Sequence, residues 1–92
     1  MIREGAFLQC VSLREIFIPH TVKSIKEEAF SQCSQMTKAI LGDGLEEIRL
    51  ASFAECTSLH EILIPHTVRV IKDRIFARCS QLSTVILGDG QE

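Results

Sequence analysis

The sequence predicts an α/β repeat solenoid, with a four-stranded parallel sheet on one face and turns or short 3₁₀ or helical segments on the other. Two observations lead to this fold class. The first is a strict period of 23 residues, kept by columns of cysteine, phenylalanine and isoleucine. The second is a short alternating apolar pattern, typical of a β-strand, that occurs once in every period. Because short repeats of this kind stack as coils, we expect one strand from each coil.

Four repeats account for the 92 residues and form one expected domain, residues 1–92. The expected repeat boundaries are about 2–24, 25–47, 48–70 and 71–92. The columns that define the period are Cys10, Cys33, Cys56 and Cys79, then Phe7, Phe30, Phe53 and Phe76, and then Ile2, Ile25, Ile48 and Ile71. The sequence also has a longer period of two repeats, since the odd repeats contain IPHTV where the even repeats contain LGDG. This alternation indicates duplication of a two-repeat block.

Each repeat contains one expected strand, which the first repeat shows as LREIFI at residues 13–18. Alternate side chains of this segment point inward. Pro19 then ends the strand, because proline lacks the N–H that a sheet needs, and the glycine of LGDG suits a tight turn at the same place. Farther along, Phe30 and Cys33 are three residues apart, which suits a short helical or 3₁₀ turn. One coil buries too little apolar surface to fold alone, so stability is expected to come from stacking.

Charge and composition argue against two classes of partner. The net charge is −2, and lysine and arginine form no cluster of the kind that binds nucleic acid. The uninterrupted apolar runs are much shorter than the roughly 20 residues that span a bilayer. Residues 1–10 carry charges at Arg3 and Glu4 and do not resemble a secretory signal. We therefore expect no nucleic-acid partner, no membrane span and a cytoplasmic location with reduced cysteines, or the cell surface if the chain is part of a longer protein.

The four cysteines lack the arrangement of a metal site. A zinc site gathers its thiolates around one ion, whereas stacking would separate Cys10 from Cys79 by about 14 Å, three times the strand spacing. The column is expected to be a buried ladder of thiols whose parallel side chains are poorly placed for disulfides. No serine has a paired base, and LGDG lacks the lysine and hydroxyl residue of a phosphate loop. The sequence thus predicts no catalytic residue, no metal and no cofactor.

The turns after the strands carry an alternating column of histidine and aspartate, which consists of His20, Asp43, His66 and Asp89. Neighbours about 4.8 Å apart could pair as imidazolium and carboxylate as the pH falls. The favoured interpretation is a solvated turn with weak surface pairs, since exposed ion pairs contribute less than about 1 kcal/mol. A pH-sensitive ladder and a metal site are the alternatives.

The outward side of the strands carries the candidate binding residues. One column is wholly apolar and is named the apolar row: Phe17, Ile40, Leu63 and Ile86. Beside it lie the polar row, Glu15, Lys38, Glu61 and Thr84, and the rim, Arg14, Thr37, His60 and Ser83. A contiguous apolar stripe on a surface is typical of a contact with another macromolecule. Strand propensity alone, or a segment that covers the stripe, would also explain large aliphatic residues here.

The unit I-x-x-x-A-F-x-x-C-x-x-L-x-x-I-x-I-P-x-x-V resembles the BspA-like class of leucine-rich repeat in every coil. Its best copies begin at Ile2 (IREGAFLQCVSLREIFIPHTV) and at Ile25 (IKEEAFSQCSQMTKAILGDGL). The resemblance implies a curved, right-handed solenoid used for binding, often in surface proteins of bacteria and protists, without catalytic residues. The sequence departs from the pattern at Ala39, where a larger aliphatic residue is usual, and at Gln91, which stands in a column of leucine and valine.

The leading functional hypothesis is a non-catalytic module that binds another protein through the strand face. In this hypothesis the apolar row anchors the partner and the charges of the polar row set its register. The alternative is a fragment of a longer cell-surface adhesin or scaffold array. Both ends of a stack of four coils would expose core atoms, so end-to-end self-association is a further expectation.

Overall fold

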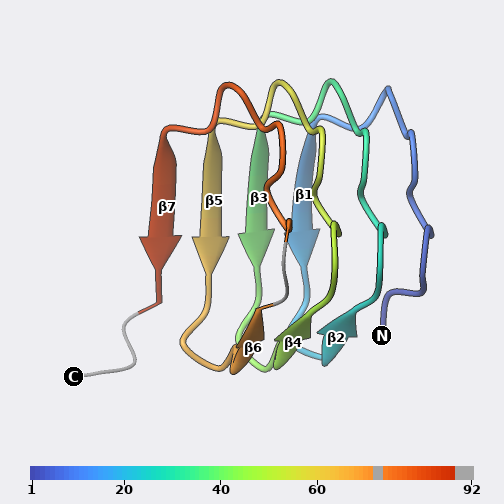
Figure 1. Cartoon of the computed structure of the whole chain (residues 1–92). Helices are drawn as coiled ribbons and strands as arrows, with labels where there is room; N and C mark the ends of the chain where they lie inside the picture. The colour runs from blue at the N-terminus through green and yellow to red at the C-terminus, as the bar shows by residue number, and fades with distance from the viewer. Residues whose placement is uncertain (72–73, 89–92) are drawn as a thin grey trace.

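The chain is a parallel β-solenoid, shown in Figure 1 by a computed structural model that describes residues 1–71 and 74–88. The four longer strands form one sheet in the order β1–β3–β5–β7, and three shorter strands form a second sheet in the order β2–β4–β6. The strands of the large sheet are β1 (Glu15–Ile18), β3 (Lys38–Leu41), β5 (Glu61–Ile64) and β7 (Thr84–Leu87). Those of the small sheet are β2 (Ser24–Ile25), β4 (Glu47–Ile48) and β6 (Val70–Ile71). The predicted four-stranded parallel sheet is therefore confirmed.

The register of the large sheet follows the sequence period. Glu15 is paired with Lys38, Lys38 with Glu61, and Glu61 with Thr84, so each step along the sheet advances by one repeat. Within β3 and β5 the residues alternate between half-buried and buried, which is the pattern of strands with one side on a core. Side chains at equal repeat positions consequently form straight rows across the sheet.

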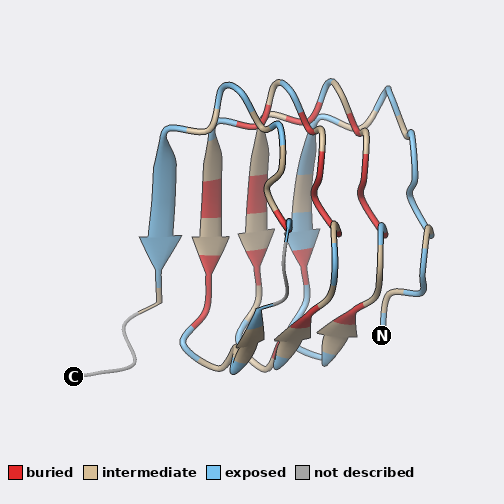
Figure 2. Cartoon of the chain, in the orientation of Figure 1, coloured by how far each residue is buried: buried red, intermediate tan, exposed pale blue. Residues whose placement is uncertain are grey.

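A ladder of phenylalanine rings fills the part of the core that lies under the turns. The ring centroids of Phe7 and Phe30 are 5.0 Å apart, those of Phe30 and Phe53 are 5.2 Å apart, and those of Phe53 and Phe76 are 6.2 Å apart. The two central rings are fully buried. Figure 2 shows that buried residues concentrate in the middle coils, whereas β7 is exposed along its whole length. Each coil is thus enclosed mainly by its neighbours, as expected for a solenoid.

The small sheet was not predicted from the sequence. Its strands pair in parallel with the same period, since Ser24 is paired with Glu47 and Glu47 with Val70. A parallel bridge between Ile2 and Ile25 continues this pairing into the first coil. A two-residue strand is too short to show the alternation by which strands are detected in a sequence.

For this wall the sequence predicted turns or short 3₁₀ or helical segments. The structure shows turns there, and no helical or 3₁₀ segment is found among the described residues. Lys26 to Ala29 and Phe30 to Cys33 are each closed by a backbone hydrogen bond between their end residues. The third residue of each turn, Glu28 or Gln32, has a positive φ of 57° or 62°, as type II turns require. Since both kinds of helix need negative φ throughout, these residues prevent helix formation.

Two columns of the solenoid share this left-handed backbone. The columns are Gly5, Glu28, Ala51 and Arg74, and Gln9, Gln32, Glu55 and Arg78. Only the first of these eight residues is a glycine, for which the conformation carries no steric cost. The remaining seven are side-chain-bearing residues in a conformation that costs roughly 1–2 kcal/mol each.

Replacement of Ala51 by glycine is therefore expected to raise the free energy of unfolding by about 1 kcal/mol, because Ala51 has a φ of 56°. In a helix the same change would lower it by roughly 0.5–1 kcal/mol, so the sign separates a turn from a helix. Urea unfolding followed by circular dichroism measures the change. Ala77, which is also half-buried but has no positive φ, is the matched control, and Ala77→Gly should destabilise. A loss of stability in Ala51→Gly would contradict the left-handed assignment.

Candidate functional site

The strand face brings together all residues of the apolar row. Phe17 is paired with Ile40, Ile40 with Leu63, and Leu63 with Ile86, in neighbouring strands. Neighbouring strands lie about 4.8 Å apart, so these side chains form a continuous stripe across β1, β3, β5 and β7. The structure thus assembles from four separate repeats a row that the sequence could only suggest.

The apolar row is on the solvent side of the sheet. Phe17 is 65% exposed and Ile86 is 41% exposed, while Ile40 and Leu63 in the middle strands are half-buried. The next residue along β3, Leu41, is by contrast 1% exposed. The row is therefore covered by its own neighbours only in part, and its outer surface is open within the described chain.

The polar row runs parallel to the apolar row. Glu15 and Thr84 are exposed, and Lys38 and Glu61 are half-buried. Within the part of the chain that the structure describes, no ion pair joins members of this row. Its charges alternate in sign across the first three strands and face the same side as the apolar row. The strand face therefore combines an apolar stripe with charges that are not neutralised by contact with one another.

Hydrogen bonds between neighbouring coils hold the backbone of the rim residues in place. The N–H of Thr37 donates to the carbonyl of Arg14 at 2.7 Å, and the Thr37 hydroxyl donates to the same oxygen at 3.3 Å. Ser83 makes the corresponding pair of contacts with the His60 carbonyl, at 3.1 and 3.3 Å. Arg14, His60 and Ser83 are exposed, whereas Thr37 is half-buried.

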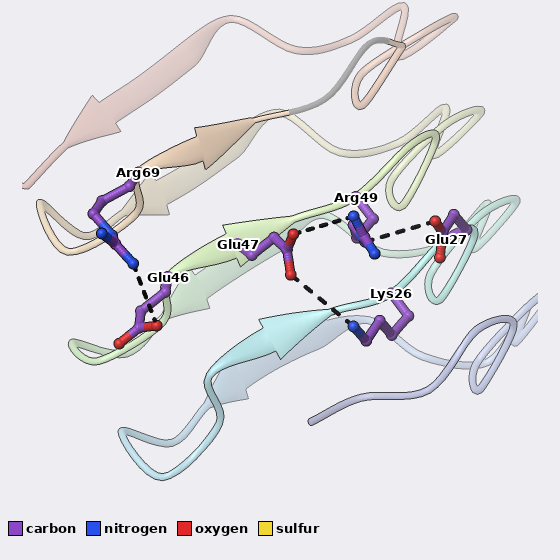
Figure 3. Close-up of polar contacts among 6 residues, drawn as sticks. All are labelled: Lys26, Glu27, Glu46, Glu47, Arg49 and Arg69. Atoms are coloured by element: carbon purple, nitrogen blue, oxygen red, sulfur yellow. Dashed lines mark ion pairs between the residues drawn. The ribbon is translucent and has the colours of Figure 1, made fainter.

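The wall that contains the small sheet has a different electrostatic character, which the sequence interpretation missed. Arg49 lies 3.2 Å from a carboxylate oxygen of Glu47 and 3.6 Å from one of Glu27, and Lys26 lies 4.0 Å from Glu47 (Figure 3). A further pair of the same wall joins Arg69 to Glu46 at 3.8 Å. The signal in the sequence was opposite charge at positions about one repeat apart for three of these pairs, and two residues apart for Arg49 and Glu47. These charges neutralise one another, which distinguishes this wall from the strand face.

Neighbouring turns in the column of histidine and aspartate contact one another through a glycine and a threonine. A Cβ atom on Gly44 would lie 2.6 Å from the His20 carbonyl oxygen, so glycine permits the close approach of the two turns. The Thr67 hydroxyl accepts from the Gly44 N–H at 3.0 Å and donates to the Leu45 carbonyl at 2.7 Å. Among the described members of the column, which are exposed, no ion pair is formed; Asp89 lies outside the described residues. Gln91 lies outside them as well.

Each cysteine after the first donates a hydrogen bond within the coil stack. The thiols of Cys33, Cys56 and Cys79 donate to the carbonyls of the phenylalanines 26 residues earlier, each at 3.1 Å. Each of these thiols thus links its coil to a backbone carbonyl of the preceding coil. All four cysteines are free thiols, and no group of three or more potential ligands in the described residues could hold a metal ion. The column is part of the core architecture.

The thiols of Cys33 and Cys56 shift each other's pKa. The neighbouring Cys56 thiol lowers the pKa of Cys33 to about 7, whereas the interaction with Cys33, together with burial, raises the pKa of Cys56. Burial raises the pKa of Cys79. Cys33 and Cys56 are nevertheless fully buried, so neither sulfur is presented to a reagent in solvent. A reactive cysteine needs both thiolate character and access, and this pair lacks access.

A polar groove at the corner between the turns and the strand starts was also missed by sequence reasoning. Its floor includes the left-handed residues Gln9, Gln32, Glu55 and Arg78, and Gln9 Nε2 donates to Gln32 Oε1 at 2.7 Å. The groove results from the repeated turn geometry and has no close pair of acid and base. It therefore adds a polar surface to the solenoid without the features of a catalytic site.

Comparison with known proteins agrees with this architecture. The family described as "BspA type Leucine rich repeat region (6 copies)" matches residues 1–91. Repeats of this type are structural or interaction modules. No curated protein matches the sequence. In the described residues there is no helix with the length and hydrophobicity needed to cross a bilayer.

The crystal structure of a leucine-rich cell surface protein from Faecalibacterium prausnitzii A2-165 is similar to this chain, with a TM-score of 0.89 and 27% sequence identity. The similarity covers 97% of this chain and 23% of that protein. The chain therefore spans about a quarter of the length of its structural neighbour. The neighbour is a cell surface protein, which is the location expected for this chain if it is part of a longer protein.

Proposed function

Because the chain belongs to the BspA-type leucine-rich-repeat family, we propose that it is a non-catalytic module that binds another protein through the strand face of β1–β3–β5–β7. Its structural neighbour is a cell surface protein, and we place this chain in the same setting as part of the proposal. The repeat architecture supports such a role, since a stack of coils presents an extended surface to which every repeat contributes side chains.

The observation that carries the proposal is the in-register apolar row. Phe17 is 65% exposed and Ile86 is 41% exposed at its two ends, and large aliphatic side chains fill the positions between them. Apolar side chains that align across an exposed sheet gain free energy when a partner removes them from water, by about 25 cal/mol for each Å² buried. One flank of the row carries the polar and charged side chains of the polar row, as the rims of protein interfaces do.

The contrast between the two walls supports the choice of face. On the wall of the small sheet, lysine, arginine and glutamate neutralise one another over 3.2–4.0 Å. On the strand face, Glu15, Lys38 and Glu61 form no ion pair among the described residues. Charges without mutual partners are suited to selecting a complementary surface. The partner is expected to present apolar side chains opposite the apolar row and charges in the order basic, acidic, basic opposite the polar row.

Charge reversal on the strand face tests this proposal. The double variant Ile40→Lys and Leu63→Glu places opposite charges in the centre of the apolar row without changing the net charge. Proteins retained by the immobilised parent chain are identified, and the purified partner is titrated against each variant by calorimetry. The double variant should weaken the dissociation constant at least tenfold, a loss of about 1.4 kcal/mol or more.

The matched control replaces two exposed apolar residues outside the sheet, with Leu50→Lys and Val11→Glu. It introduces the same charges and should leave the dissociation constant unchanged. Circular dichroism verifies that both double variants keep their sheet content. A partner that binds the strand-face variant as tightly as the parent would rule out the strand face as its binding surface.

A second candidate role is a structural one, in which these coils are one section of a longer surface array. The observation in its favour is that the chain matches 23% of a leucine-rich cell surface protein. In such an array the coils would set the spacing between other domains, and the apolar row would be one part of a longer stripe. This role predicts that charges on the strand face change neither retention of partners nor cell-surface binding.

A further inference from the structure

We infer that the polar groove at the corner of the solenoid binds an extended chain of neutral sugars, with one sugar over each coil. The groove has a volume of about 530 Å³, and all four coils contribute to its lining. Its outer side, named the groove row, consists of Gln9, Gln32, Glu55 and Arg78. Its inner side consists of Val11, Ser34 and Thr57. The groove therefore runs across the coils and presents one equivalent position per repeat.

The backbone of the groove row is held in place before any ligand binds. The N–H groups of Gln9, Gln32 and Glu55 donate to carbonyls of the following coil at 2.7–2.9 Å. All four members of the row have a φ of 59–62°, so their side chains leave the backbone in the same direction. A surface ordered in this way loses little conformational entropy on binding.

The spacing of the coils on this wall matches a sugar chain better than a peptide. The rings of Phe7, Phe30 and Phe53, two residues before the groove row, are 5.0 and 5.2 Å apart from one coil to the next. In an extended β-1,4-linked chain, successive sugar rings advance by nearly the same distance. An extended peptide advances by about 3.3 Å per residue, and side chains on one side of it repeat after about 6.6 Å. Only the sugar chain therefore stays in step with the coils.

The side chains of the groove suit hydroxyl groups. Each member of the groove row ends in a planar amide, carboxylate or guanidinium group. Such a group can contact two adjacent equatorial hydroxyls of a sugar ring with two of its atoms. Gln9 Nε2 donates to Gln32 Oε1 at 2.7 Å, which leaves both amides with further donors and acceptors. Ser34 and Thr57 add hydroxyls that both donate and accept from the inner side.

The charges of the groove favour a neutral polymer. Glu55 and Arg78 are the charged residues of its lining, and their charges sum to zero. Between them and other described residues, the structure has no ion pair or side-chain hydrogen bond, so both groups are available to a ligand. A polyanion needs a basic surface, which this lining does not provide. A protein partner needs an apolar centre, whereas Val11 is the one large apolar side chain of the lining.

Nuclear magnetic resonance titrations of the isotopically labelled chain test this inference. The probes are β-1,4-linked tetrasaccharides of glucose, mannose, xylose and N-acetylglucosamine, with α-1,4-linked maltotetraose as the curved control. At least one β-1,4-linked probe should shift the amide signals of residues 9–11, 32–34 and 55–57 more strongly than maltotetraose does. Its affinity should rise about threefold with each sugar from the disaccharide to the tetrasaccharide, because each sugar adds about one hydrogen bond. The affinity should not fall with added salt, since the ligand is neutral.

A pair of matched double variants assigns the binding to the groove. Gln32→Gly with Glu55→Gly removes two planar groups from the groove row, and glycine keeps the positive φ at both positions. This variant should weaken the dissociation constant by about tenfold or more. The control, Glu28→Gly with Ala51→Gly, replaces two left-handed residues of the same two coils that do not line the groove. It should bind the sugar as the parent does.

The outcome is separate from that of the proposed protein-binding role. The strand-face variant Ile40→Lys with Leu63→Glu leaves the groove intact and should bind the sugar as tightly as the parent. Absence of shifts with every tetrasaccharide at millimolar concentration would overturn the inference. So would shifts that lie outside the groove, equal losses in the two glycine variants, or a groove that binds dextran sulfate and none of the neutral probes.

Discussion

Replacement of Phe53 by alanine is expected to lower the free energy of unfolding by about 3–5 kcal/mol. The Phe53 ring is fully buried between the rings of Phe30 and Phe76, with centroids 5.2 and 6.2 Å away. The parallel sheets hold neighbouring coils at a fixed spacing, so the coils cannot close together over the cavity. The sequence contains no tryptophan or tyrosine, so urea unfolding is followed by far-ultraviolet circular dichroism.

The control for this prediction is Phe17→Ala, at a phenylalanine that is 65% exposed. It removes the same side chain from the strand face and should change the free energy of unfolding by no more than about 0.5 kcal/mol. Equal losses for the two variants would contradict the assignment of one ring to the core and the other to the surface.

Replacement of Gly42 by alanine is expected to cost about 1–3 kcal/mol, because a Cβ atom there overlaps backbone that cannot move aside. That atom would overlap the Ile18 carbonyl oxygen and would lie 3.0 Å from the carbonyl carbon of Pro19. The Gly42 N–H also donates to Ile18 at 2.7 Å, at the point where β1 and β3 end side by side. Relief of the overlap would separate these strand ends and lengthen that hydrogen bond. Thermal and urea unfolding both report the loss.

Asp43→Ala is the control for Gly42→Ala, because it changes the adjacent, exposed residue of the same turn. It should leave the free energy of unfolding within about 0.5 kcal/mol of the parent. If Gly42→Ala left the free energy of unfolding equally unchanged, the close approach of neighbouring turns in the structure would be contradicted. The alternation of IPHTV and LGDG would then need another explanation.

The solenoid was predictable because one period controls several physical requirements at once. Phe30 and Phe53 must lie one repeat apart for their rings to stack, and Ile40 and Leu63 must lie one repeat apart for their strands to pair in register. Any column of the repeat therefore carries the same information about stacking. The strand in each repeat was predictable for a second reason, since alternation of inward and outward residues over four to six positions is distinctive.

For the turn wall the sequence left two alternatives open, turns or short helical segments, and the helical alternative was wrong. Apolar residues three apart, such as Phe30 and Cys33, fit a helical turn and a type II turn equally well. The positive φ of Glu28 and Gln32 distinguishes the type II turn from a helical turn. Neither glutamate nor glutamine indicates a positive φ in a sequence. Glycine at the equivalent Gly5 was the only compositional sign. Stacking of the coils imposes this conformation against the local preference.

The rows of side chains on the strand face could be predicted from the sequence. The difference in charge pairing between the strand face and the wall of the small sheet could not. Alternation and period together place Phe17 beside Ile40, which the register confirms. The ion pairs of Arg49 with Glu47 and Glu27 depend on the small sheet, whose two-residue strands leave no pattern in the sequence. Only the structure shows that charges on the wall of the small sheet pair with one another, whereas the described charges of the polar row do not. The identity of the partner depends on the partner's own surface, so this sequence cannot specify it.

Photo-crosslinking tests the proposed binding face most directly. A benzophenone amino acid is placed at Phe17, on the strand face, or at Leu50, an exposed residue that follows β4 on the other wall. Each protein is irradiated with the partner identified by retention on the parent chain, and the crosslinked product is mapped by mass spectrometry. Binding through the strand face predicts a crosslink from position 17 and none from position 50. A crosslink from position 50 with none from position 17 would contradict it.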